Sequence, residues 1–296
     1  MTLIRRFIVF SVIGILGFGS LSALQAEGFD EDGIAARIQE IPLDDRFVLE
    51  AFFRELLFHE GGAFVLFGSK PLALSGYYRI ENSNLTGWGA FILLSHHNGQ
   101  LKEGWMIWQK YKHLFPMNNF MLKSYGTPDD DSVTLYFLNK TLCAEMIQRY
   151  IEDFKTVLGD RISCEIIMDW FNDPSKDLIE SLGNHQALYG TLLGFGRDNA
   201  WFFHRRLILW QDFLDLTATQ EKVAAIRAEE APRIGPYWEE APYDHLSYIV
   251  PPAFVGSIYS QETEELQKRY LDERRKICKI YENGRFLEIT LAALAR

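Results

Sequence analysis

The spacing of apolar residues changes several times along this chain, and each spacing predicts a different element. Across residues 44–62, apolar positions recur every three or four residues, between the capping candidates Asp44 and Asp45 and the stop signals Gly61 and Gly62. This is the pattern of an amphipathic helix. The same periodicity predicts further helices over 140–158, 184–193 and 199–216, and a long closing helix from about residue 261.

Shorter apolar runs that are separated by turn residues predict strands. Two such strands flank the turn 68–71, and two more, over 118–126 and 131–139, form a β-hairpin around the turn 126–130. A further strand is predicted over 163–171, whereas 87–115 predicts two short helices broken at Asn98-Gly99. Together these elements predict an α+β fold, in which several helices, one of them a long C-terminal helix, pack on a small antiparallel sheet.

The N-terminus has the composition of an export signal. Arg5 and Arg6 precede a run from Phe7 to Ala26 that contains no charged residue. A basic start, an apolar middle and small residues at the end are typical of a secretory signal peptide, here over 1–26. The run is also nearly long enough to span a membrane as an uncleaved anchor. We therefore expect an exported protein, periplasmic or secreted, and the alternative is an inner-membrane protein anchored by residues 7–26.

The remaining residues, 27–296, are numerous enough to bury the core of a single α+β domain. The segment 231–256 is rich in proline and aromatic residues, which predicts an irregular conformation. The aromatic side chains between Tyr237 and Tyr248 suit a surface that binds a glycan or a protein partner.

The acidic composition limits the partners of the chain. Its formal net charge is −10, and it becomes −12 if Arg5 and Arg6 leave with a signal peptide, so nucleic acid is not an expected partner. The closing helix has six basic and six acidic residues over 261–282, a balance typical of a solvated helix face rather than of a membrane-binding patch.

Three cysteines, Cys143, Cys164 and Cys278, are spread along the chain without a C-x-x-C motif. They therefore predict neither a zinc site nor a thioredoxin-type redox site. Either one pair is bridged in an oxidising compartment, or all three are buried as small apolar side chains.

Catalytic motifs are incomplete throughout the chain. His59-Glu60 begins like a zinc-protease motif, but Ala63 stands where the second histidine belongs. The neighbouring His96 and His97 diverge by about 100° on a helix, so they do not imply a metal site. No G-x-S-x-G turn occurs, and Asn199 takes the place of the last glycine of a dinucleotide-binding loop. We expect neither a metal ion nor a cofactor.

The stretch LLGFGRDNAWFFHRR, residues 192–206, has two interpretations. Gly194 suits the left-handed end of one helix, and Asp198 or Asn199 suits the N-cap of the next, so the stretch connects two helices. A helix N-terminus beside an arginine is also a place where anions bind. For this alternative the candidate ligand-binding residues are Arg197, Asp198, Asn199, His204 and Arg205.

Three stretches of the chain carry a resemblance to a known family. HEGGAFVLFGSKPLALSGYY, YGTLLGFGRDNAWFFHRR and PPAFVGSIYSQETEELQKRYLDERRKICKIY together resemble an uncharacterised, lineage-restricted family of envelope-directed proteins from chlamydia-like intracellular bacteria. The resemblance implies a bacterial exported protein. It implies no activity, no cofactor and no catalytic residue.

Two classes of function remain. The signal segment, the acidic surface and the incomplete motifs favour a non-enzymatic protein of the envelope or host interface that binds a partner protein or a small anionic or glycan ligand. The alternative is a hydrolase or transferase whose site is assembled from distant residues, with His59, Glu60, Arg197 and His204 as candidates. Convergence of these four side chains in one pocket would favour the enzyme.

Overall fold

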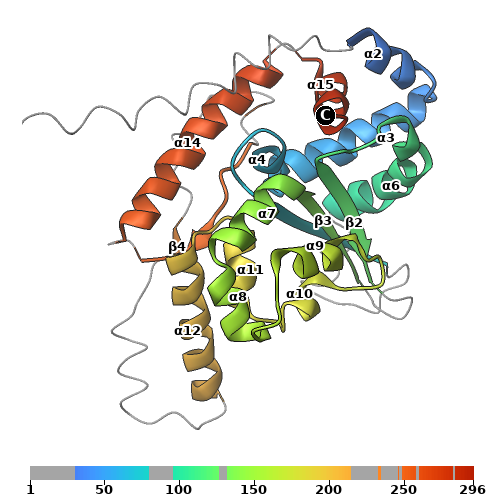
Figure 1. Ribbon diagram of the computed structural model, residues 1–296. Helices are drawn as coiled ribbons and strands as arrows, with labels where there is room; N and C mark the ends of the chain where they lie inside the picture. Colours follow the sequence, from blue (N-terminus) through green and yellow to red (C-terminus); the bar gives the residue numbers. More distant parts are fainter. Residues whose placement is uncertain are drawn as a thin grey trace, which may run out of the picture.

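A small sheet lies at the centre of the molecule, with helices on both of its faces (Figure 1). The computed structural model describes residues 31–79, 96–126, 132–214, 233–234, 246, 249–257, 260–282 and 284–296. The predicted signal segment 1–26, the first of the two helices predicted over 87–115, and most of the segment 231–256 lie outside these ranges.

The main sheet has three antiparallel strands in the order β1-β3-β2. Successive side chains of a strand point to opposite faces of the sheet, and β3 has apolar residues on both. Val133, Leu135 and Phe137 enter one core, whereas Tyr136 and Leu138 enter the other. The sheet is therefore the middle layer of three. Its strands are β1 (Leu72–Tyr78), β2 (Phe120–Tyr125) and β3 (Ser132–Asn139).

The first helical layer covers the face of the sheet that contains Phe137. Aromatic side chains dominate its core, and edge-to-face pairs such as Phe53–Trp108 and Phe64–Tyr270 join different helices. The layer comprises α2 (Glu31–Gln39), α3 (Leu43–Arg54), the π-helical turn η1 (Glu55–His59), α4 (Gly62–Leu66), α6 (His96–Tyr111), the short η2 (Lys112–Leu114), α14 (Gln261–Tyr281) and α15 (Phe286–Leu294).

The second helical layer covers the opposite face, where Leu138 meets Ile147 and Phe154 in a separate core. It comprises α7 (Lys140–Arg149), α8 (Ile151–Leu158), α9 (Cys164–Asn172), α10 (Leu178–Ser181) and α11 (Gln186–Leu192). The helix α12 (Arg197–Leu214) packs on α11 and α14, and the two-residue strands β4 (Arg233–Ile234) and β5 (Phe254–Val255) pair beside it.

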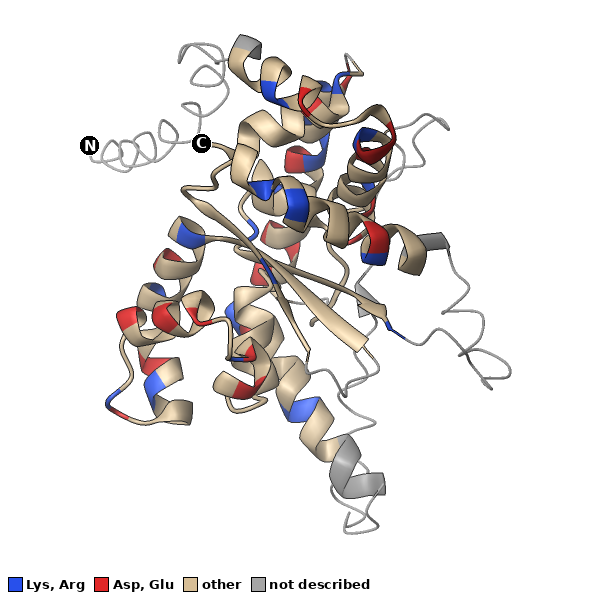
Figure 2. Ribbon diagram, turned by 90° about the vertical axis from the view of Figure 1, so that its right-hand side faces the viewer, with Lys and Arg blue, Asp and Glu red and all other residues tan. Residues whose placement is uncertain are grey.

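Charged side chains are concentrated on the helices and loops, and they are nearly absent from the main sheet (Figure 2). Among the residues of β1, β2 and β3, Lys123 alone is charged. Its ammonium group donates to the carbonyls of Phe171, Asp173 and Lys176, so it satisfies the carboxyl end of α9 and the turn that follows. A sheet that is buried on both faces has few other places for a charge.

These features confirm the predicted α+β class, the β-hairpin of β2 and β3, and the long C-terminal helix. Along α14, Leu266, Tyr270, Ile277 and Tyr281 are buried and form an apolar stripe. The helix predicted over 44–62 is also present as α3 and η1, and Gly61 ends it with a φ of 73°. Asp44 and Asp45 lie within its first turn, however, and not at its N-cap, which is Pro42.

The strand predicted over 163–171 is wrong, because this stretch forms α9. The Ser163 hydroxyl accepts the backbone N–H of Ile166 and caps the helix. Ile167 and Phe171 are buried four residues apart, which is the spacing of a helix face. The apolar residues of this stretch therefore pack along one side of a capped helix.

Three other element predictions are corrected. Residues 63–67, predicted as a strand, belong mostly to α4, whose five residues are all buried, and full burial removes the alternation that distinguishes the two structures. No break occurs at Asn98-Gly99, because α6 runs unbroken from His96. The single helix predicted over 140–158 is divided into α7 and α8 at Tyr150, although it ends at Gly159 as expected.

None of the described helices combines the length and the apolar composition that a membrane span needs.

Candidate functional site

The connection between α11 and α12 is fixed by residues from distant parts of the chain. Gly194, with a φ of 77°, follows the last turn of α11, which confirms the predicted left-handed helix end. Its carbonyl accepts the Tyr270 hydroxyl at 2.6 Å, and the neighbouring Leu193 carbonyl accepts the ammonium group of Lys70. The stretch is therefore a structural connection, as the first of the two interpretations required.

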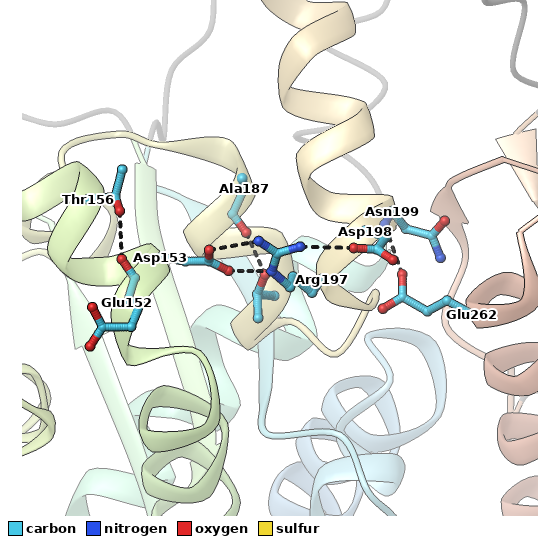
Figure 3. A network of polar contacts seen from close by, with 9 residues as sticks. Glu152, Asp153, Thr156, Ala187, Arg197, Asp198, Asn199 and Glu262 are labelled. Carbon is cyan, nitrogen blue, oxygen red and sulfur yellow. Dashed lines mark hydrogen bonds and ion pairs between the residues drawn. The ribbon is translucent and has the colours of Figure 1, made fainter.

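The N-terminus of α12 is capped in a way that the sequence did not indicate. Asp198 and Asn199 were predicted as N-caps, but α12 already begins at Arg197, so both lie in its first turn. The backbone N–H of Asn199 instead donates to Glu262 Oε2 of α14 at 2.9 Å (Figure 3). A carboxylate at this end also interacts favourably with the helix dipole. The first turn of α12, offered by the sequence as an anion site, thus receives a carboxylate from the protein itself.

Asn199 is a structural residue. Its side chain is 1% exposed, donates to the carbonyl of Phe195 at 3.2 Å and accepts the hydroxyl of Thr263 at 2.9 Å. These bonds join the start of α12 to the first turn of α14. Asn199 is turned toward α14 and does not line the cavity described below.

Arg197 links α12 to α8 through a two-point ion pair. Its Nε and Nη2 atoms donate to the two carboxylate oxygens of Asp153 at 2.6 and 2.9 Å, and Nη1 reaches Asp198 at 3.1 Å (Figure 3). Hydrogen bonding to Arg197 lowers the pKa of Asp153, and the same pairing raises the pKa of Arg197. The guanidinium group is therefore held in one orientation before any ligand arrives.

A polar cavity of about 360 Å³ lies between α8 and α12 at this ion pair. The spacing of four residues between Arg197, Trp201 and Arg205 places all three on one face of α12. Among the described residues Arg205 makes no ion pair, so its donors are available. The cavity is lined by Asp153, Thr156, Arg197, Asp198, Trp201 and Arg205.

His204, the remaining candidate ligand-binding residue, contacts His185 and does not line the cavity. Its ring contacts that of His185 in a tilted arrangement, with centroids 3.8 Å apart, and Trp201 lies beside both rings. The structure therefore brings three of the five candidates, Arg197, Asp198 and Arg205, to one cavity, whereas Asn199 and His204 contact other elements.

The four residues of the enzyme alternative do not share this cavity. His59 ends η1 and Glu60 follows it, and neither lines the space around Arg197. His204 contacts His185 outside the lining. Within the described ranges no three His, Cys, Asp or Glu side chains lie close enough together to hold a metal ion.

The three cysteines are free thiols. Cys143 is buried and donates to the carbonyl of Pro71 at 3.3 Å, whereas Cys164 and Cys278 are partly exposed. Burial raises the pKa of Cys143 and, to a smaller extent, that of Cys164. The interpretation as small buried side chains therefore holds for Cys143, and its thiol is a weak nucleophile at neutral pH.

Comparison with protein-family models, with curated proteins and with solved structures gives no match. The resemblance to proteins of chlamydia-like bacteria stays a prediction.

Proposed function

We propose that this chain is a non-enzymatic binding protein whose cavity between α8 and α12 holds a small anion that also carries hydroxyl groups, such as a sugar acid. The observation that supports this most directly is the arrangement of Arg205 and Trp201 beside an arginine that Asp153 has already oriented. Oriented polar groups beside an aromatic side chain are typical of small-molecule sites.

The balance of hydrogen-bonding groups favours an anion. A guanidinium group has five N–H donors, and Arg197 uses three of them on Asp153 and Asp198, which leaves two. Arg205 adds a second guanidinium group, without an ion pair among the described residues. Arginine binds carboxylates and phosphates through two parallel hydrogen bonds, so this end of the cavity suits an oxyanion.

The remaining groups favour hydroxyls on the same ligand. Asp198 is 69% exposed at its side chain and keeps carboxylate lone pairs that can accept hydroxyl groups. The Trp201 indole offers an apolar face of the kind that packs against a sugar ring. With two carboxylates and two guanidinium groups in the lining, the cavity is not simply basic, so a bare inorganic anion fits it less well than a hydroxylated one.

The polar groups of the cavity are poorly placed for catalysis. The Thr156 hydroxyl donates to the carbonyl of Glu152 at 2.7 Å in its own helix. Asp153, a carboxylate that could act as a general base, has a pKa lowered by Arg197 and is therefore a weak base. These contacts support binding over the hydrolase or transferase alternative.

The binding proposal is tested by isothermal titration calorimetry with D-glucuronate, and with D-glucose as the neutral probe of the same ring. We expect glucuronate to bind more tightly than glucose. Arg205→Gln should weaken glucuronate binding about tenfold or more, because a charge-assisted hydrogen bond contributes roughly 1.5–3 kcal/mol. The matched control is Arg275→Gln on the exposed side of α14, which should bind glucuronate as the wild type does. Equal affinities for the two sugars, or no loss in Arg205→Gln, would contradict the proposal.

We further propose that the protein acts outside the cytoplasm, in the envelope or at a host interface. The support is the order of Arg5, Arg6 and the uncharged run to Ala26. Cell fractionation followed by intact-mass measurement tests this. A soluble chain that begins near Glu27 supports export, a full-length chain in the membrane fraction supports the anchored alternative, and a full-length chain in the cytosol contradicts both.

A further inference from the structure

Two histidines join the start of α11 to the middle of α12. His185 directly precedes α11, and His204 lies on α12. Their ring centroids are 3.8 Å apart at an angle of 35°. The ring of Trp201, one turn before His204, lies 5.2 Å from His185 and 6.0 Å from His204. We call the pair His185 and His204 the histidine latch.

The surroundings of the latch suit neutral rings and not charged ones. The Nδ1 atoms of both rings are buried and have no hydrogen-bond partner. A neutral imidazole can keep one nitrogen without a proton, but a protonated ring carries N–H groups on both nitrogens, and each then needs an acceptor. Burial lowers the pKa of both histidines. At His185 the neighbouring His204 lowers the pKa further, and an interaction with the residue's own backbone opposes these two effects only in part.

The charged groups on α12 and α8 do not neutralise the positive charge that a protonated ring of the latch would carry. Arg205 and Arg206 follow His204 on α12, so the residues next to it in the helix supply no carboxylate. Asp153 supplies a carboxylate on α8, but both of its oxygens are bound by Arg197.

Among the residues that the structure describes, no carboxylate forms an ion pair with either ring of the latch. The helix α11 has no charged residue. The helix α7, which packs on α11, has Glu145 and Arg149 exposed to solvent. On α14, Glu262 is bound to the first turn of α12. Two protonated rings in contact would therefore repel each other, and within the described ranges no carboxylate is paired with either ring to offset this repulsion.

We propose that the histidine latch is an acid-sensitive switch, in which protonation of His185 and His204 breaks the contact between the two rings and releases α12 from the start of α11. Trp201 packs on both rings and also lines the cavity between α8 and α12. Release of the latch therefore changes the surroundings of Trp201 and the shape of the cavity. The switch itself does not depend on which ligand the cavity binds.

The test is the tryptophan emission of the full chain between pH 7.5 and pH 5.0, compared among variants. The wild type should show a change whose midpoint lies below pH 6.5, since both histidines have lowered pKa values. His204→Phe and His185→Phe retain an aromatic ring but cannot be protonated, so each should abolish the change and keep the emission observed at pH 7.5. The control is His113→Gln, an exposed histidine on η2, which should behave as the wild type does.

A second measurement covers the case in which the phenylalanine variants do not fold. The ring C–H signals of the wild-type histidines are followed by NMR as the pH is lowered. Two of them should titrate below pH 6.5, and the indole N–H signal of Trp201 should shift over the same pH range. Emission that does not change with pH, a change that persists in both phenylalanine variants, or histidines that all titrate near 6.5 would each overturn the proposal.

Discussion

Lys70 provides the clearest prediction about stability, because few contacts offset the free-energy cost of burying its charged ammonium group. It is 4% exposed, and its ammonium group donates to the Leu193 carbonyl and lies 5.0 Å from the centre of the Phe195 ring. Burial lowers the pKa of Lys70 from 10.5 to about 7. This difference corresponds to about 5 kcal/mol in favour of the neutral amine in the folded chain.

The sign of the pH dependence follows from the two pKa values of Lys70. Below pH 7 the folded and unfolded chains both carry the proton, and the folded chain bears the full cost of burying a charge. Above pH 7 the folded chain loses the proton, whereas the unfolded chain keeps it until about pH 10.5. The free energy of unfolding should therefore rise with pH, by about 1.5 kcal/mol between pH 7.0 and 8.5 from this residue.

The measurement is urea denaturation at pH 7.0 and 8.5, followed by circular dichroism. These limits avoid the histidine latch, which titrates at lower pH, and Cys143, whose raised pKa reduces stability above pH 9. Lys70→Met keeps the length of the side chain and should remove most of the rise, whereas Lys268→Met, at an exposed position of α14, should leave it in place. An equal rise in Lys70→Met and the wild type would refute the reasoning.

Three further substitutions test the contacts that fix α12, each by chemical denaturation at pH 7. Gly196→Ala should lower stability by about 1–3 kcal/mol, because the φ of Gly196 is 87° and an added Cβ would lie 2.5 Å from the carboxyl carbon of Glu262 on α14. The control is Gly99→Ala, which has open space around it and should raise stability by roughly 0.5 kcal/mol. Asn199→Ala should cost about 1–3 kcal/mol, because it removes two hydrogen bonds, one of them buried. Asp153→Asn should cost roughly 1 kcal/mol, since Arg197 is partly exposed and solvent screens the pair. Because the folded pKa of Asp153 is lowered, its contribution is fully present above the pKa of the unfolded chain and is lost as pH falls through the lower pKa of the folded chain, so the variant should lose less stability in acid than the wild type. Equal stability of Gly196→Ala and Gly99→Ala, or an unchanged value for either of the other variants, would contradict these assignments.

The sequence predicts an element well where its side chains alternate between core and solvent. The amphipathic pattern within 44–62 identifies α3, whereas the β2–β3 hairpin is identified by its turn residues 126–130. Prediction fails where an element is buried on all sides or is short. The five buried residues of α4 show no periodicity. In α9 the apolar run also suits a strand, and the N-cap at Ser163 is the local feature that favours a helix. Whether such a segment forms a helix or a strand depends on its packing against the rest of the chain.

The cavity could be predicted only in part for the same reason. The spacing of Arg197, Trp201 and Arg205 on one helix face is visible in the sequence, although Trp201 was not among the candidates. Asp153 lies 44 residues before Arg197, and no local pattern connects them. Glu262 and His185 were missed as well, since their roles arise only when α14 and the start of α11 pack against α12.

The most direct test of the proposed ligand site is an NMR titration of the labelled protein with D-glucuronate, observed at the arginine Nε–H and tryptophan indole N–H signals. The proposal predicts concentration-dependent shifts for Arg205 and Trp201, with little change at Arg275 on α14. Shifts confined to other parts of the molecule, or none at millimolar glucuronate, would contradict a sugar-acid site between α8 and α12.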